Sequence, residues 1–172
     1  MNVIAISGTP GTGKTTLAKR LSKKTKYLYI DVNRIIKKYN ISEKYDRRRK
    51  CKIVDVKKLN ERLIDIIDQY KKLSLKNKMS GLIIDSHLSH HLPRKYVDLC
   101  IITKCELKIL KKRLEKKKYS EEKIRENLDC EIFDICLNEA EENKHKLLII
   151  DATKGINTNS ILARIKWNKY LH

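Results

Sequence analysis

The sequence predicts an α/β protein built on a parallel sheet of about five strands, with helices on both faces. Short apolar runs alternate with stretches of helical period, a glycine-rich loop follows the first run, and aspartates end three runs. Strands that are apolar throughout are typical of parallel sheets buried on both faces. The 172 residues contain no repeat and no linker rich in proline, glycine or serine, so we expect a single domain over residues 1–172.

The predicted strands are the five apolar runs. Asp31, Asp85 and Asp151 end three of them. Ligands of such sheets bind beyond the carboxyl ends of the strands, so we expect the chemistry in the loops after residues 6, 31 and 85. The runs are NVIAI (2–6), YLYID (27–31), GLIID (81–85), VDLCIIT (97–103) and KLLIID (146–151).

Helical periodicity fills the segments between the strands. A helix is expected directly after the glycine-rich loop, and an apolar stripe from Leu59 to Tyr70 predicts the next. A long helix is expected to begin after Ser120, whose hydroxyl suits an N-cap, and to continue to Leu137. A last helix is expected to include residues 161–167.

Composition limits the classes of protein. The five cysteines form no CxxC pair, which favours free thiols in a reducing cytoplasm over a disulfide framework or a zinc ribbon. No apolar run is long enough to cross a membrane, and the first residues do not resemble a secretory signal. We therefore expect a cytoplasmic protein with no membrane partner.

The net charge of +19, from 40 Lys and Arg against 21 Asp and Glu, is the strongest compositional signal. Such a surface attracts polyanions, of which nucleic acid is the usual one. Solvated lysines on helix surfaces would give the same composition. Most basic residues are spread along the predicted helices, but the segment RRRKCK at residues 47–52 is a dense basic run.

The segment GTPGTGKTT at residues 8–16 is a phosphate-binding loop. Gly8, Gly13, Lys14 and Thr15 complete the pattern G-x-x-x-x-G-K-[ST] between a predicted strand and a predicted helix. Three of the five glycines of the chain lie here, where they let backbone N–H groups wrap phosphate oxygens. Lys14 is expected to reach the β- and γ-phosphates, and the Thr15 hydroxyl to bind Mg²⁺.

Several P-loop classes can be weighed against the rest of the chain. The length argues against large motor and AAA-type ATPases. A small GTPase needs D-x-x-G and N/T-K-x-D, but DSHL at 85–88 lacks the glycine and TKCE at 103–106 ends in glutamate. A small-molecule kinase of the nucleoside monophosphate type fits better, because such chains carry an acceptor-binding insertion after the second strand and a cationic lid.

Both parts have candidates in the sequence. Residues 31–54 form a basic segment, expected to be helix and loop, in which Asp31, Arg34 and Arg47 are candidate acceptor-binding residues. Residues 116–126 form the candidate short lid. Arg113, Lys117 and Arg125 are its candidate cations, because a phosphoryl group in transfer spreads negative charge that positioned cations stabilise.

The segment DSHLSHH at residues 85–91 holds three of the five histidines. A zinc site on His87, His90 and His91 is one interpretation. The position of Asp85 at the end of a strand near the P-loop favours another, in which Asp85 and His87 belong to the nucleotide site. His90 and His91 are then expected to face solvent or to cap the loop before Pro93.

GTPGTGKTT, DSHLSHHLP and KKYSEEKIRENLDCEIFDICLNEA together resemble the adenylate kinase isoenzyme 6 family, also known as the coilin-interacting nuclear ATPase family, in its archaeal form. The resemblance runs from residue 2 to about residue 143. It implies a P-loop fold like that of nucleoside monophosphate kinases, broad adenylate kinase activity with ATPase activity, and a role in small ribosomal subunit maturation. The implied partners are a small-subunit ribosomal protein and its rRNA.

By position, the resemblance assigns ATP binding to a set of P-loop and lid residues and a Walker-B-like role to Asp85 and His87. The family's lid Arg-Gly-Tyr is here Lys117, Lys118 and Tyr119, so the bidentate guanidinium and the glycine hinge are both replaced. The acidic stretch after the family's tyrosine is replaced by Arg47 and its basic neighbours. The ATP-binding set is Gly11, Gly13, Lys14, Thr15, Thr16 and Lys117.

The resulting hypothesis is Mg²⁺-dependent phosphoryl transfer from ATP to AMP or another nucleoside monophosphate. Lys14, Asp85 and His87 are the candidate catalytic residues, and Thr15 and Asp85 the candidate ligands of the Mg²⁺ that accompanies ATP. Two alternatives stay open. One is an ATP-dependent ribosome-assembly factor with incidental kinase activity, and the other is a kinase with a non-nucleotide acceptor.

Overall fold

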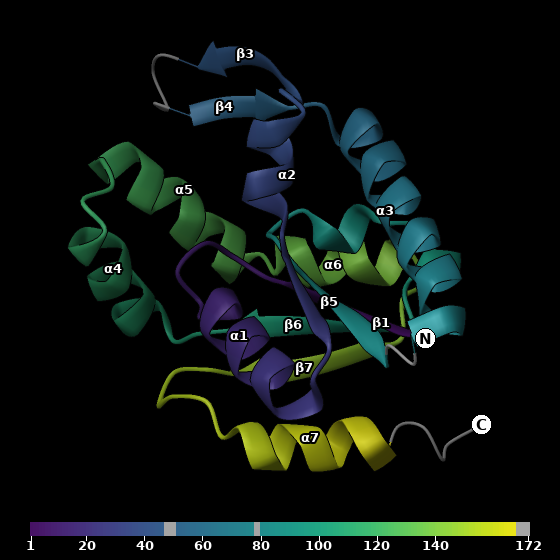
Figure 1. Cartoon of the computed structure of the whole chain (residues 1–172). Helices are drawn as coiled ribbons and strands as arrows, with labels where there is room; N and C mark the ends of the chain where they lie inside the picture. Colours follow the sequence, from purple (N-terminus) through teal and green to yellow (C-terminus); the bar gives the residue numbers. More distant parts are fainter. Residues whose placement is uncertain (47–50, 78–79, 168–172) are drawn as a thin grey trace.

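A computed structural model describes residues 1–46, 51–77 and 80–167. Its centre is a sheet of five parallel strands, as the sequence predicts (Figure 1). The strands are β1 (Asn2–Ser7), β2 (Leu28–Asp31), β5 (Gly81–Asp85), β6 (Leu99–Lys104) and β7 (Leu147–Asp151). They lie in the order β2-β5-β1-β6-β7, so β1 is central and the chain reverses its direction of winding beside it.

The central strands are buried on both faces, which explains their unbroken apolar sequence. Alternate side chains of β1 enter two different cores: Val3 and Ala5 on one face, Ile4 and Ile6 on the other. Asp31 and Asp85 end neighbouring strands in register. The carboxyl edge of the sheet therefore collects the acidic residues at the place where ligands of such folds bind.

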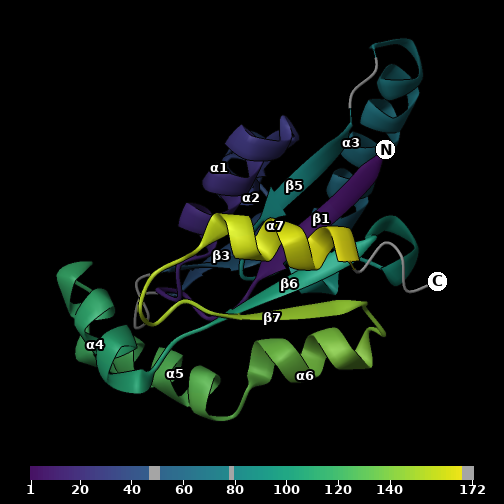
Figure 2. The same ribbon diagram turned by 90° about the horizontal axis from the view of Figure 1, so that it is seen from below.

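Helices cover both faces of the sheet, and Figure 2 shows strands passing between α1 and α6. The first core includes side chains from α2 (Val32–Lys38), α3 (Val56–Asn77) and α6 (Ile135–Glu142). The opposite core includes side chains from α1 (Lys14–Thr25) and α7 (Thr158–Trp167). The remaining helices, α4 (Leu107–Lys116) and α5 (Glu121–Ile132), pack on each other through a smaller core.

Two short 3₁₀ helices follow β5, at η1 (Ser89–His91) and η2 (Arg94–Tyr96). They carry the histidine-rich segment from the carboxyl edge of the sheet back toward β6 (Figure 1).

The segment after β2 differs from the helix and loop that its sequence suggests. The helix α2 is present, but an antiparallel hairpin follows it, formed by β3 (Ser42–Asp46) and β4 (Cys51–Val54). The polar and basic composition hides these strands, because neither shows a clear alternation of apolar and polar residues. Residues 47–50 at the turn lie outside the described part of the chain.

The long helix expected from Ser120 to Leu137 is wrong in one respect. Ser120 does cap its start by accepting a hydrogen bond from the N–H of Lys123. Asp134 then adopts a left-handed conformation with φ 52°, and the chain divides into α5 and α6. The helical spacing of apolar residues continues through the break, so periodicity alone does not reveal it.

In the part of the chain that is described, no helix combines the length and the apolar character needed to cross a membrane.

Candidate functional site

The P-loop connects β1 to α1 in a conformation that depends on glycine. Gly8 has φ 128°, and a Cβ added there would lie 2.4 Å from the carbonyl oxygen of Thr103 on β6. No other residue fits without moving the backbone. The Thr12 hydroxyl fixes the far side of the loop, since it donates to the Thr9 carbonyl and lies 2.6 Å from the Thr103 hydroxyl.

The first turn of α1 is suited to bind an anion. Its N-cap, Gly13, makes no side-chain capping bond, and the turn contains no acidic residue. The N–H groups at this end are therefore left for a ligand, and the helix dipole favours a negative one. Thr15 and Thr16 are exposed here and line a cavity.

Lys14 lies buried beneath the loop. Its Nζ donates to the carbonyl oxygens of Gly8 at 2.7 Å and Thr9 at 2.9 Å. Burial lowers the pKa of Lys14 from 10.5 to about 8, with the nearby Lys117 acting in the same direction. An anionic ligand would stabilise an ammonium that is buried against two neutral carbonyls.

Asp85 ends β5 beside the loop and is only 4% exposed. Tyr29 on β2 donates its phenolic hydrogen bond to Oδ2 of Asp85 at 2.9 Å. The sequence did not single out Tyr29, because its contact with Asp85 joins residues 56 positions apart. Its place on the strand next to β5, near the carboxyl end, is the signal that could have found it.

His87 is exposed and lines the same cavity as Lys14 and Asp85. Partial removal from water and the positive charge of Lys14 lower the pKa of His87. The side chain keeps part of its surface in contact with solvent, so this removal from water is incomplete. The imidazole is neutral at pH 7 and offers one donor and one acceptor to the cavity.

Glu131 of α5 is a buried carboxylate that the sequence did not single out. Its Oε2 accepts a hydrogen bond from the Thr9 hydroxyl at 2.5 Å, and its Oε1 accepts one from the N–H of Cys105 at 2.8 Å. Glu131 thus joins the P-loop to the end of β6. A charged residue on the predicted helix stripe was the available signal, because Glu is rarely buried without partners.

The candidate lid cations take three different positions. Arg113 is half-buried and lines the cavity, where Nη2 donates to the carbonyls of Ala152 at 2.8 Å and Thr153 at 3.1 Å. Lys117 is the C-cap of α4, is exposed and also lines the cavity. Arg125 is exposed on α5 and is not among the residues that line the cavity. Lys37 and Lys116, which belong to the basic segments expected to bind phosphates, also line it, and so do Arg20 and Lys123, which the sequence did not single out.

The candidate acceptor residues lie at the start of α2. Asp31 caps that helix by accepting a hydrogen bond from the N–H of Asn33, and it forms an ion pair with Arg34 at 3.8 Å. Neither Asp31 nor Arg34 lines the cavity, whereas Asn33, Ile36 and Lys37 do. Arg47 lies outside the described residues.

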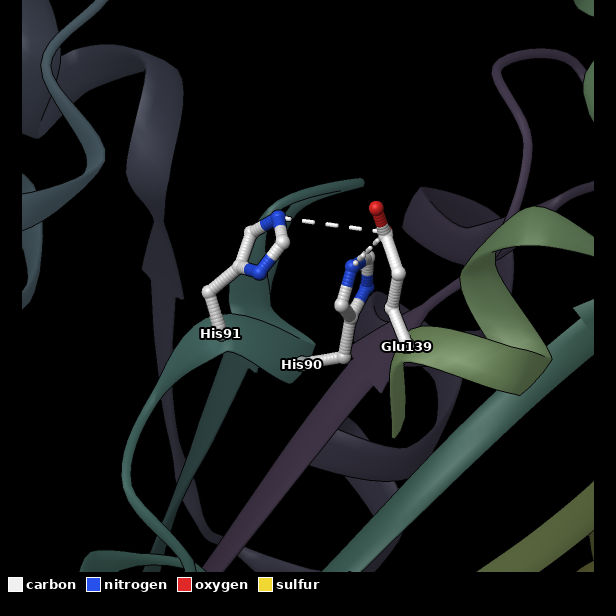
Figure 3. A group of neighbouring side chains, drawn as sticks. All are labelled: His90, His91 and Glu139. Carbon is white, nitrogen blue, oxygen red and sulfur yellow. Dashed lines mark hydrogen bonds and ion pairs between the residues drawn. The ribbon is translucent and has the colours of Figure 1, made fainter. Parts of the chain in front are cut away.

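The expectation that His90 faces solvent or caps the loop before Pro93 is wrong. His90 is 1% exposed; its Nδ1 lies 2.6 Å from the Ser7 hydroxyl, and its Nε2 lies 2.8 Å from Oε2 of Glu139 on α6. The structure also differs from the zinc interpretation on three histidines. The residues that come together are His90, His91 and Glu139 (Figure 3).

These elements surround one cavity of about 1400 Å³. The P-loop and the start of α1 form one side, and residues from α2, the loop after β5, α5 and α6 form the others. A pocket for one small ligand typically has about 300–1,000 Å³. The cavity is therefore large enough for a nucleoside triphosphate and a second substrate.

A family model described as "AAA domain" matches residues 4–134, which is most of the chain. This match spans the P-loop and the loop after β5.

Two curated relatives match most of the chain. A protein of Methanosarcina acetivorans, provisionally named as an adenylate kinase, is 37% identical over 151 residues, covering 88% of this chain and 77% of its own. The "Adenylate kinase isoenzyme 6 homolog" of Dictyostelium discoideum is 32% identical over 148 residues, covering 86% of this chain and 79% of its own.

Among solved structures, the shikimate kinase of Acinetobacter baumannii in complex with shikimate is similar with a TM-score of 0.61. The two share 14% sequence identity, and the alignment covers 98% of this chain and 95% of the kinase. The likeness shows the fold, which is that of the small P-loop kinases.

Proposed function

The chain belongs to the adenylate kinase isoenzyme 6 family and to the broader AAA-domain family, and on this premise we propose that it is a nucleoside monophosphate kinase. It transfers a phosphoryl group from ATP to AMP, with tolerance for other nucleoside monophosphates. The observation that supports this most is the cavity of about 1400 Å³, which extends from the P-loop to α2. A site for ATP alone would not need the second half of this space.

In the proposed mechanism, the P-loop amides and the N-terminus of α1 hold the phosphates of ATP. Lys14 exchanges the carbonyls of Gly8 and Thr9 for phosphate oxygens, which restores a charged partner to its ammonium. Gly11 and Gly13 let the backbone lie close to the ligand. Thr16, next to Thr15 in the first turn of α1, adds a further hydrogen-bond donor to the phosphates. Positioning of this kind supplies most of the catalysis in phosphoryl transfer.

The donors around the P-loop suit the Mg²⁺ that accompanies ATP. The Thr15 hydroxyl and the Asp85 carboxylate are oxygen ligands of the kind Mg²⁺ prefers, and both line the cavity. When bound, Mg²⁺ would neutralise charge on the transferred phosphate. Tyr29 holds the Asp85 carboxylate in place for this role.

We assign His87 to the orientation of a water molecule or of a phosphate oxygen, which would give ATPase activity beside transfer. A neutral imidazole in the cavity can accept a hydrogen bond from water without adding positive charge. His87→Ala should lower ATP hydrolysis at least about tenfold while the thermal unfolding midpoint changes little. Unaltered hydrolysis would leave His87 with a structural role only.

Lys117 and Arg113 are proposed to close over the phosphates, with Arg125 reaching them only if the lid moves. On the acceptor side, Asp31 and Arg34 are proposed to shape the start of α2. Arg47 is proposed to bind the acceptor phosphate. Asn33 and Lys37 line the cavity and are proposed to contact the acceptor from α2.

A panel of acceptors with radiolabelled ATP tests the proposal. AMP, the other nucleoside monophosphates and a non-nucleotide acceptor such as shikimate are each incubated with the protein, and the labelled products are separated. We expect label on AMP first and no transfer by Lys14→Ala. Nucleoside monophosphate kinase activity would be contradicted if label appeared only on a non-nucleotide acceptor. It would also be contradicted if every acceptor gave labelled free phosphate and no labelled acceptor.

A second proposed function is that of an ATP-dependent assembly factor of the small ribosomal subunit, acting on its rRNA or on a small-subunit ribosomal protein. The observation that favours it is the net charge of +19, part of which lies on the exposed face of α4. Binding to RNA should weaken steeply as salt is raised. AMP-dependent ADP formation with no binding to small-subunit particles would argue against it. The exposed lysines of α4 are Lys108, Lys111, Lys112 and Lys116.

A further inference from the structure

Two histidine rings and one carboxylate converge at the wall of the nucleotide cavity. His90 and His91 end η1, and Glu139 reaches them from α6 (Figure 3). The two Nε2 atoms lie 2.8 Å and 3.9 Å from the same oxygen, Oε2 of Glu139. One nitrogen or oxygen atom from each residue lies within 4.8 Å of the others.

Hydrogen bonding explains only half of this arrangement. The 2.8 Å contact of His90 is a hydrogen bond if its Nε2 carries the proton. The 3.9 Å separation from His91 is too long for one, although its ring still directs Nε2 toward the same oxygen (Figure 3). A cation between the three groups would account for both rings.

The distances suit a small transition-metal ion. Zinc binds imidazole nitrogen at about 2.0–2.1 Å and carboxylate oxygen at about 2.0–2.2 Å, so tetrahedral ligand atoms lie about 3.4 Å apart. The two measured separations from Oε2, 2.8 Å and 3.9 Å, fall on either side of that value. Small side-chain rotations would equalise them without moving the backbone.

Buried neighbours already position the two rings. His90 Nδ1 lies 2.6 Å from the buried Ser7 hydroxyl, and a metal-bound histidine usually donates its second N–H to such a partner. His145 Nε2 is 2.9 Å from the His90 carbonyl, and Asn60 Nδ2 donates to the His91 carbonyl at 2.8 Å. The backbone under both rings is thus fixed by side chains from other elements.

We propose that His90, His91 and Glu139 bind one divalent transition-metal ion, with zinc as the preferred occupant. Three protein ligands with one position left open is the arrangement of zinc sites that keep an exchangeable ligand. The open position would face the cavity, because all three residues line it. The site differs from the Thr15 and Asp85 pair in chemistry, since imidazole nitrogens select zinc over Mg²⁺.

The site would also couple two parts of the fold. It joins η1, in the loop that follows Asp85 and carries His87, to α6, which packs against η1. Binding to the folded state alone raises the thermal unfolding midpoint by mass action. The inference goes beyond the proposed kinase activity and does not require it, because metal binding is measured without ATP or acceptor.

Calorimetric titration of the untagged, reduced, full-length chain with Zn²⁺, in a buffer containing millimolar Mg²⁺, tests the site. We expect one Zn²⁺ per chain and a rise in the unfolding midpoint. Co²⁺ in place of Zn²⁺ should give the visible absorption of a tetrahedral nitrogen and oxygen site, without the near-ultraviolet thiolate band. A thiolate band would instead place the metal on Cys130 or Cys136, which also line the cavity, and would overturn the assignment.

Single substitutions complete the test. Glu139→Gln and His91→Asn change half-buried residues and should each weaken Zn²⁺ binding at least about tenfold. Glu141→Gln, on an exposed position of the same helix, should leave the affinity unchanged. His90 is not the primary target, because it is buried and its replacement could unfold the chain. The proposal would be overturned if the wild type bound no stoichiometric Zn²⁺. It would also be overturned if Glu139→Gln and His91→Asn bound Zn²⁺ as tightly as the wild type.

Discussion

The hydroxyl of Tyr29 donates a hydrogen bond to Oδ2 of Asp85 across 2.9 Å, from one strand of the sheet to its neighbour. Burial, and then the hydrogen bond and charge of Asp85, raise the pKa of Tyr29. The phenol therefore remains a donor at physiological pH. A neutral group on β2 thus fixes one oxygen of the carboxylate that we propose as a Mg²⁺ ligand.

Tyr29→Phe removes this donor and keeps the ring. We expect the Mg²⁺ concentration for half-maximal turnover to rise about tenfold, because the groups that orient a metal ligand affect affinity to that extent. A Mg²⁺ titration of the initial rate measures this. Tyr27→Phe is the matched control, since its hydroxyl accepts a hydrogen bond from Asn2 and Tyr27 does not line the cavity. Equal Mg²⁺ dependence in both variants would contradict a role for Tyr29.

Lys14→Met should separate stability from activity. Below pH 8, Lys14 is charged in both the folded and the unfolded protein. Burial disfavours the charged form in the folded protein only, so the pKa of Lys14 is about 8 there, against 10.5 in the unfolded chain. The ligand-free variant should therefore be more stable than wild type at pH 7 by about 1–3 kcal/mol, while turnover is lost. Urea unfolding without nucleotide measures the difference.

The pH dependence of that difference checks its cause. Between pH 8 and pH 10.5 the unfolded wild-type chain holds a proton on Lys14 that the folded chain has released, so wild-type stability rises with pH in this window. The advantage of Lys14→Met should shrink accordingly. Lys23→Met, at an exposed position of α1, should show neither effect. A gap that stays constant from pH 7 to pH 10.5 would point to packing and not to charge.

The sheet and the P-loop could be predicted because their signals are local. A strand buried on both faces is apolar throughout, and the P-loop pattern lies between such a strand and a helix. The five predicted strands are confirmed with shifts of one or two residues at their ends. The β3–β4 hairpin escaped prediction, because β3 is mostly polar, β4 has only four residues, and their pairing joins positions on either side of a turn.

The partners within the site depend on contacts that no local pattern encodes. Thr9 and Glu131 are 122 positions apart, and His90 and Glu139 are 49 apart. The sequence identified Asp85 and His87 by their place after a strand, but it could not show what holds them. His90 was expected at the surface for the same reason, since its burial depends on Ser7 and α6.

Lys118→Gly should stabilise the protein. Lys118 has φ 56°, a left-handed conformation that favours glycine, at the position where the family has the glycine of Arg-Gly-Tyr. We expect about 1 kcal/mol of added stability, because the strain of a side chain in this region is removed. Thermal unfolding measures it, and Lys116→Gly, inside the last turn of α4, is the control and should be destabilising. A loss of stability in Lys118→Gly would mean that its side chain makes contacts worth more than the strain.

Glu131→Gln should loosen the P-loop from beneath. The amide oxygen can still accept from the N–H of Cys105, but the NH₂ group then donates to the Thr9 hydroxyl, whose own hydrogen loses the carboxylate as its acceptor. A buried donor without a partner costs about 1–3 kcal/mol, so we expect a loss of stability of that size and weaker ATP binding. Urea unfolding and nucleotide titration measure the two effects.

Two further variants identify the contact that matters. Asp129→Asn changes an exposed carboxylate on the same helix and should leave both quantities unaltered. Thr9→Val removes the hydroxyl partner, so combining it with Glu131→Gln should cost less than the sum of the single changes if Thr9 and Glu131 interact. Strict additivity would assign the effect of Glu131 to Cys105 and the end of β6, and the P-loop would then be held by its own glycines and threonines.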